Sequence, residues 1–102
     1  MSNWTYYVDL LRQGRVLQIR PKGQSMKPLI NSGDLIEITP LSDSTPLEVG
    51  DAVFCKVKGH FFVHKITAIK NDQYQISNNH GHVNGWTSRR QIFGKITNNL
   101  GQ

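Results

Sequence analysis

The 102-residue sequence predicts a mainly β domain that begins with one short helix. Short apolar runs alternate with polar residues at a period of two over most of the chain, which is typical of half-buried strands. Nine glycines and four prolines are spread between these runs, as expected where turns join many short strands. At this length we expect one domain over residues 1–102, with a helix in 1–15, a β core in 16–97 and a tail in 98–102.

The helix is predicted over residues 3–13, NWTYYVDLLRQ. Its apolar side chains recur at helical spacing, Ser2 or Asn3 can cap its first turn, and Gly14 ends it. We expect its apolar face to pack over one end of the sheet. Its polar face carries too little basic charge to favour a membrane surface, although recruitment to a membrane by a partner stays open.

The β core is predicted to contain six strands joined by turns and two longer loops. Lys58-Gly59 forms a tight hairpin and Asn71-Asp72 the next turn. The proline-rich residues 40–50 and the glycine-broken residues 78–86 are the loops. The expected strands cover residues 16–20, 35–39, 52–58, 60–69, 73–77 and 92–97, followed by a frayed end at 98–102.

Composition excludes several classes of protein. Every apolar run is far shorter than the roughly 20 residues needed to span a bilayer, and residues 1–15 lack the pattern of a signal peptide. Cys55 is the only cysteine, which excludes an internal disulfide and fits a reducing compartment. We therefore expect a cytoplasmic protein without a membrane anchor.

The net charge of +5 raises the question of nucleic-acid binding. The basic residues are scattered, and strand alternation places Lys56 and Lys58 together on a solvated face. Nucleic acid is therefore not the expected partner. A basic nucleic-acid or partner-binding β domain, with Arg89 and Arg90 among its contacts, stays open as an alternative.

The segment from Gly23 to Asp34, GQSMKPLINSGD, carries the strongest functional signal. Ser25 is the candidate nucleophile, and a serine needs a base within hydrogen-bond reach to attack a carbonyl at neutral pH. Gly23 permits the unusual backbone of a sharp corner. Pro28 removes a backbone donor and fixes φ, so the segment forms a shaped loop rather than a strand.

Four features in order resemble the LexA-like and type I signal peptidase clan of serine peptidases (S24/S26-type). They are G-x-S-M-x-P at 23–28, Gly33-Asp34 and Gly50-Asp51 before aliphatic strands, and the stretch VHKI at 63–66. The resemblance covers roughly residues 16–97. It implies a LexA/signal-peptidase-like coiled antiparallel β fold and a serine endopeptidase that binds an extended peptide segment of a protein substrate, with small side chains next to the scissile bond.

His64 is the expected base. Strand alternation places it on a face with Phe62 and Ile66, the more enclosed side, and turns Lys65 away. By resemblance, His64 stands where bacterial signal peptidases and LexA-like proteins carry a lysine, and where eukaryotic and archaeal signal peptidases carry a histidine. A histidine can act as a base near neutral pH without extreme tuning of its pKa.

The third member of the site is expected to be Asn78. The histidine-type relatives have an aspartate in a G-D-N-like segment, and the matching stretch here is Ser77-Asn78-Asn79. An amide oxygen can fix the tautomer of a histidine, but it stabilises the imidazolium less well than a carboxylate does. Because the carboxylate is absent, a catalytically weak or inactive binding module of the same fold stays open as an alternative.

The expected substrate contacts lie around the serine. The resemblance suggests that Met26 forms part of the cleft wall. Gly23 stands where bacterial signal peptidases place a serine that helps to hold the oxyanion, so backbone N–H groups, that of Ser25 among them, would do this here. The substrate-binding residues are expected to be Gly23, Gln24, Met26 and Pro28.

Other readings of the polar residues are weaker. The four histidines, His60, His64, His80 and His82, have no accompanying carboxylate that completes a usual metal site, so we expect neither metal nor cofactor. Cys55 is expected to be buried rather than nucleophilic. Asp34 and Asp51 follow glycines at strand starts, where their carboxylates would form hydrogen bonds with the local backbone. Whether the chain forms a homodimer stays open.

Overall fold

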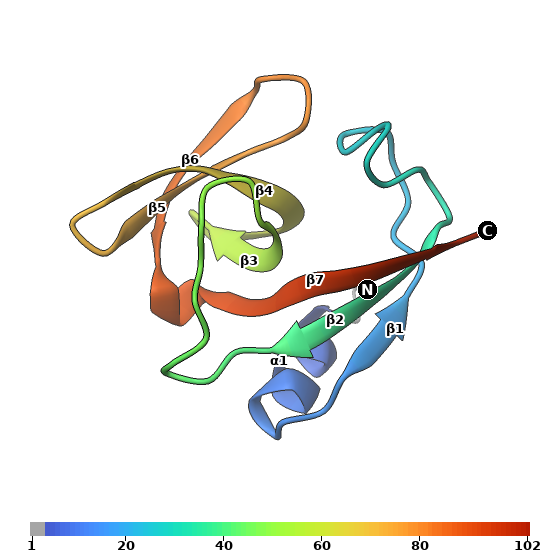
Figure 1. Cartoon of the computed structure of the whole chain (residues 1–102), viewed down its shortest axis with the longest axis horizontal. Helices are drawn as coiled ribbons and strands as arrows, with labels where there is room; N and C mark the ends of the chain where they lie inside the picture. The colour runs from blue at the N-terminus through green and yellow to red at the C-terminus, as the bar shows by residue number, and fades with distance from the viewer. Residues whose placement is uncertain (1–3) are drawn as a thin grey trace.

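One twisted antiparallel sheet dominates the computed structural model, which describes residues 4–102 (Figure 1). Its strands follow the order β1-β2-β7-β3-β4-β5-β6. The expected helix cap at Ser2 or Asn3 lies outside the described residues. The elements are α1 (Trp4–Arg12), β1 (Leu17–Ile19), β2 (Leu35–Pro40), β3 (Ala52–Val57), β4 (His60–Lys70), β5 (Gln73–Ser77), β6 (Val83–Ser88), the 3-10 helix η1 (Arg89–Gln91) and β7 (Ile92–Gly101).

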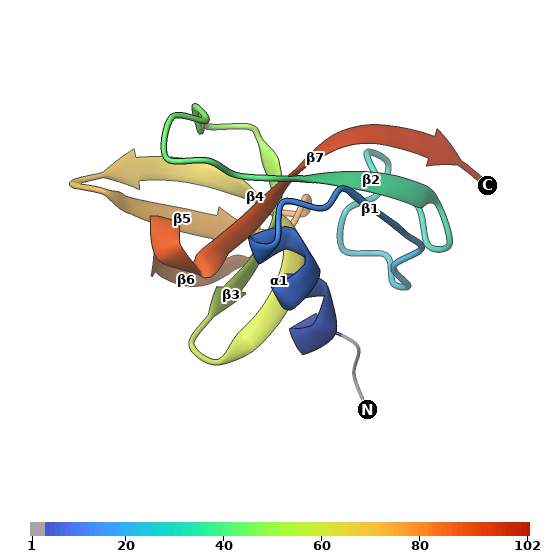
Figure 2. The same cartoon turned by 90° about the horizontal axis from the view of Figure 1, so that it is seen from below.

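The mainly β fold with one short N-terminal helix is confirmed. Helix α1 packs against β1, β2 and β7, as Figure 2 shows, and buries Val8 and Leu11 there. The expected hairpin at Lys58-Gly59 is present, with positive φ values of 51° and 85° that give a turn matching the twist of the strands. No helix within residues 4–102 is long and apolar enough to cross a membrane.

The sheet buries side chains on both of its faces. Strand β3 shows this directly, because Phe54 belongs to one core cluster while Val53 and Cys55 belong to the other. All three side chains are fully buried. Helix α1 covers the first cluster, and strands β4 and β5 enclose the second with Ile66 and Ile76.

Two segments differ from the sequence expectation. Residues 83–88 form strand β6, which pairs with β5, so the loop expected over 78–86 ends at residue 82. The expected tail at 98–102 is largely strand, since β7 continues to Gly101 along β2. Side chains near the end of β7 also bond back to the serine loop: the amides of Asn99 and Gln102 donate to the buried carboxylate of Asp34 at 3.0 and 2.7 Å.

Candidate active site

Ser25 lies in the loop that joins β1 to β2. The loop is closed at its base, where the Gly33 N–H donates to the Pro21 carbonyl at 2.9 Å. Gly23 adopts a φ of +119°, which a residue with a side chain rarely takes, and its N–H donates to Ser32 Oγ at 3.0 Å. The glycine thus makes the corner that the sequence predicts, two residues before the serine.

His64 lies on β4, and Ser25 faces it. The Oγ of Ser25 is 3.0 Å from Nε2 of His64, and the side chain of His64 is only 7% exposed. Strand alternation therefore placed this histidine on the correct, enclosed face. Lys65 points elsewhere and donates from Nζ to Asn79 Oδ1 at 2.8 Å.

Asn84, and not Asn78, contacts the second ring nitrogen of His64. Its Oδ1 lies 2.7 Å from Nδ1. Because an amide oxygen only accepts, Nδ1 carries the proton and Nε2 is left to accept from the Ser25 hydroxyl. The order Ser25 hydroxyl, His64 imidazole, Asn84 amide is the arrangement of a nucleophile, its base and the group that orients the base.

A β-bulge explains how Asn84 reaches the histidine. Ser77 pairs with Val83 and Ile76 pairs with Gly85, so Asn84 is the extra residue on β6 between two paired positions. Bulges re-aim side chains and are common beside functional sites. The sequence carries one local signal of this feature, the Asn84-Gly85 pair inside the segment expected to be a loop.

Asn78 instead stabilises the loop between β5 and β6. Its Oδ1 accepts from the backbone N–H groups of His80 and His82, at 2.8 and 2.9 Å. Its own N–H donates to the His82 carbonyl at 2.9 Å. The expectation that Asn78 orients His64 is therefore corrected: this side chain shapes the loop that follows β5.

That loop holds the serine segment in place through residues 79 and 80. The Asn79 N–H donates to the Ser25 carbonyl at 2.8 Å, and its side-chain amide donates to the Lys27 carbonyl at 2.9 Å. The His80 ring bonds the Gln24 carbonyl through Nε2 at 2.9 Å. Three contacts, to the carbonyls of residues 24, 25 and 27, therefore fix the backbone around the nucleophile, and we call Asn79 and His80 the loop clamp.

Burial lowers the pKa of His64 below its ordinary value of about 6.5. The hydrogen bond that His64 donates to Asn84 opposes this change, and a charge on His82 would add to it. Phe62 contributes to the burial, since its ring stacks on the imidazole with centroids 4.8 Å apart. The imidazole is therefore neutral at pH 7, the form that can accept a proton.

Only some of the remaining candidate residues lie at the site. Gly23 and Met26 line a cavity beside Ser25, whereas Gln24 and Pro28 do not, so we do not carry these two into the proposed binding site. Burial raises the pKa of the Cys55 thiol to about 12, which removes it as a nucleophile. Within residues 4–102, no group of three or more His, Cys, Asp or Glu side chains could hold a metal ion.

Comparison with protein families agrees with this geometry. The Peptidase S24-like family matches the sequence over residues 3–97, almost the whole chain. The chain belongs to the Peptidase S24-like family. A search of curated proteins finds no match to it. Membership supports the LexA-like, signal-peptidase-like resemblance inferred from the serine motif.

Proposed function

We propose that this Peptidase S24-like protein is a serine endopeptidase that uses Ser25 as nucleophile and His64 as general base. One observation carries the proposal: two hydrogen bonds in series join the Ser25 hydroxyl, the His64 ring and the Asn84 amide. In such a series the serine proton has an acceptor, and that acceptor is held in the correct tautomer.

The reaction would proceed in two halves. Ser25 Oγ attacks the scissile carbonyl while its proton moves to His64 Nε2, and the imidazolium then protonates the leaving amine as the C–N bond breaks. Water then attacks the acyl carbon while the same nitrogen takes its proton, and the imidazolium returns a proton to Ser25 Oγ as the acyl C–O bond breaks. The Ser25 N–H is the proposed oxyanion donor, because the Gly23 N–H is already donated to Ser32 Oγ.

An extended peptide has a natural place to bind. Strand β4 pairs with β3 from residue 60 onward, but its pairing with β5 begins only at Lys65, so residues 60–64 leave one strand edge open among the described residues. Peptides commonly add to such an edge as an extra strand. Residues 21–23 line the same cavity from the other side, so the peptide would run between the two segments to Ser25.

A binding module with little or no turnover is the second candidate. The observation that favours it is the neutral amide of Asn84, which stabilises an imidazolium less than a carboxylate would. Both candidates share the peptide-binding edge and differ only in whether the bond is broken.

Cleavage of a peptide library, read by mass spectrometry, tests the endopeptidase. Ser25→Ala and His64→Ala should each lower the rate by about a thousandfold or more, and the double variant should be no slower than either single one, because residues that act as a unit are not additive. Ser44→Ala, at an exposed loop serine, is the matched control and should cleave normally. Cleavage by Ser25→Ala at the wild-type rate would refute the mechanism.

A further inference from the structure

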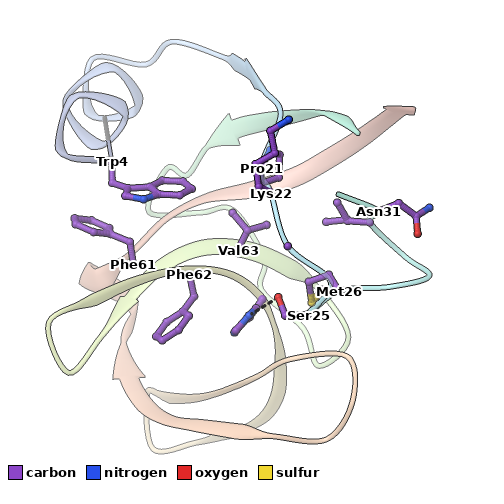
Figure 3. Close-up of a pocket in the computed structure, with 12 residues that line it drawn as sticks. Trp4, Pro21, Lys22, Ser25, Met26, Asn31, Phe61, Phe62 and Val63 are labelled. Carbon is purple, nitrogen blue, oxygen red and sulfur yellow. Dashed lines mark hydrogen bonds between the residues drawn. The ribbon is translucent and has the colours of Figure 1, made fainter. Parts of the chain in front are cut away.

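Asn84 combines the position that orients His64 with a reactive sequence. Its Oδ1 accepts from Nδ1 of His64 at 2.7 Å, and the Ser25 hydroxyl lies on the other side of the ring, joined to Nε2 by the dashed line in Figure 3. Among the asparagines of the chain, Asn84 is the one that precedes a glycine. Asparagine is a chemically labile residue, and a following glycine has no side chain to hinder attack on it. A labile residue therefore holds the base of the site.

The fold requires a glycine at position 85. Its φ is +139°, and a Cβ atom built there would lie 3.2 Å from the side chain of Val57. The same Cβ would lie 3.5 Å from Nζ of Lys58, so an ammonium group lies beside the backbone of Gly85. The β-bulge thus keeps the labile Asn84-Gly85 pair together, because a larger residue at position 85 would be strained.

The surroundings of Asn84 favour attack by the Gly85 nitrogen on Cγ of the asparagine. The N–H of His64 bonds the Oδ1 atom on which negative charge develops, as a donor in an oxyanion hole does. The ammonium of Lys58 stabilises the Gly85 nitrogen as it loses its proton. Within residues 4–102, Nδ2 of Asn84 has no hydrogen-bond partner and is accessible to water, so ammonia can leave.

The reaction needs only water. The Gly85 nitrogen forms a bond to Cγ of Asn84, the side-chain nitrogen leaves as ammonia with the proton from Gly85, and a cyclic imide remains. Water then adds to Cγ and the new C–N bond breaks, which restores the peptide bond and leaves a carboxylate. Addition of water to the backbone carbonyl gives isoaspartate instead. No group is oxidised or reduced.

We propose that Asn84 is a self-modification site, whose loss of ammonia in the folded protein leaves an aspartate facing Nδ1 of His64. The carboxylate accepts from Nδ1 as the amide does, and it adds the negative charge that the amide lacks. Of the titratable groups around the site, His82 acts on His64 and Lys58 lies beside Gly85. The modification goes beyond the proposed function, because it needs no substrate, whereas its effect on cleavage rests on that function.

Incubation of the native protein at mildly alkaline pH, followed by peptide mapping with mass spectrometry, tests the site. Asn84 should lose its amide, whereas Asn71, exposed in a tight turn and not followed by glycine, should keep it. Asn84→Gln should also keep its amide, because the longer side chain closes the ring more slowly. Lys58→Gln should slow the loss several-fold, and Lys56→Gln, on the same hairpin, should not; equal rates in the two would overturn the role of Lys58.

The aspartate form can be separated by ion-exchange chromatography, and NMR of the imidazole then reports on His64 without any substrate. The titration midpoint of His64 should lie about one unit or more above that of the unmodified protein, because a carboxylate stabilises the imidazolium. In this form kcat/KM should follow the pH profile of Asn84→Asp.

Three results would overturn the self-modification site. The first is retention of the Asn84 amide in the native protein under conditions in which the chain denatured in guanidinium chloride loses it. The second is conversion to isoaspartate alone, and the third is an aspartate form whose His64 midpoint is unchanged. A raised midpoint without peptide cleavage by either form would support the modification and refute the endopeptidase.

Discussion

His64 is the residue on which the chemistry depends, because its two ring nitrogens have different partners. Nε2 faces the Ser25 hydroxyl and Nδ1 faces the Asn84 oxygen. Burial lowers the pKa of His64, so the neutral base persists into mildly acidic solution. Asn84 holds the ring without adding a charge, which makes it the residue whose substitution is most informative.

The pH profile of Asn84→Asp is the first prediction at this scale. In the wild type, kcat/KM should fall on the acid side with a midpoint below 6.5, the side on which His64 gains its proton. A carboxylate beside Nδ1 stabilises the imidazolium, so Asn84→Asp should move this midpoint to higher pH by one unit or more. It should also raise the rate at pH 8, where His64 stays neutral in the ground state.

Asn78→Asp is the matched control for this profile. Its side chain accepts from two backbone N–H groups, a role that a carboxylate also fills, and it has no hydrogen bond to His64. The acid midpoint should therefore move much less than in Asn84→Asp. A larger shift in Asn78→Asp than in Asn84→Asp would show that we have assigned the orienting residue wrongly.

At the scale of elements, the site depends on two loops that lie far apart in sequence. The serine loop follows β1, and the loop clamp follows β5. Asn79 joins them through its backbone N–H and its side-chain amide, and Lys65 holds the amide oxygen from β4. A loop is most precise when hydrogen bonds from neighbouring elements fix it, and this clamp supplies them.

Removal of the Asn79 side chain should therefore lower turnover as well as stability. Asn79→Ala loses the bonds to Lys27 and Lys65, each worth about 1 kcal/mol, but keeps its backbone N–H to the Ser25 carbonyl. We expect kcat to fall about tenfold with the acid midpoint of the pH profile unchanged, because His64 keeps its partners. Asn98→Ala, on the exposed part of β7, should leave kcat unchanged, and a shifted midpoint in Asn79→Ala would contradict the positioning role.

The sequence was sufficient to predict most of the elements and the central pair of the site. Period-two alternation located five of the strands closely and chose His64 over Lys65. It could not locate Asn84, because a β-bulge shifts the alternation by one residue and only the pairing of β5 with β6 reveals it. The end of β7 was missed for a related reason: residues 98–101 are polar and gain their order from pairing with β2 and from bonds to Asp34.

At the scale of the whole molecule, part of the positive charge is used in structural contacts. Arg89 donates to the carbonyls of Ser42 and Thr45, and Lys95 pairs with Asp51 at 3.2 Å, so several cations have structural partners. The groove between β4 and the serine loop is mainly apolar near Trp4 and polar near Ser25. This division suits the proposed peptide substrate.

The most direct test of the account is reaction with a serine-directed phosphonylating probe, mapped by mass spectrometry. The probe needs no knowledge of the substrate and reports on the nucleophile itself. We predict that Ser25 is modified in the wild type, that the rate rises with pH through the titration of His64, and that His64→Ala reacts at least a hundredfold more slowly. Modification spread over exposed serines, with Ser25 unmodified or unaffected by His64→Ala, would contradict the account.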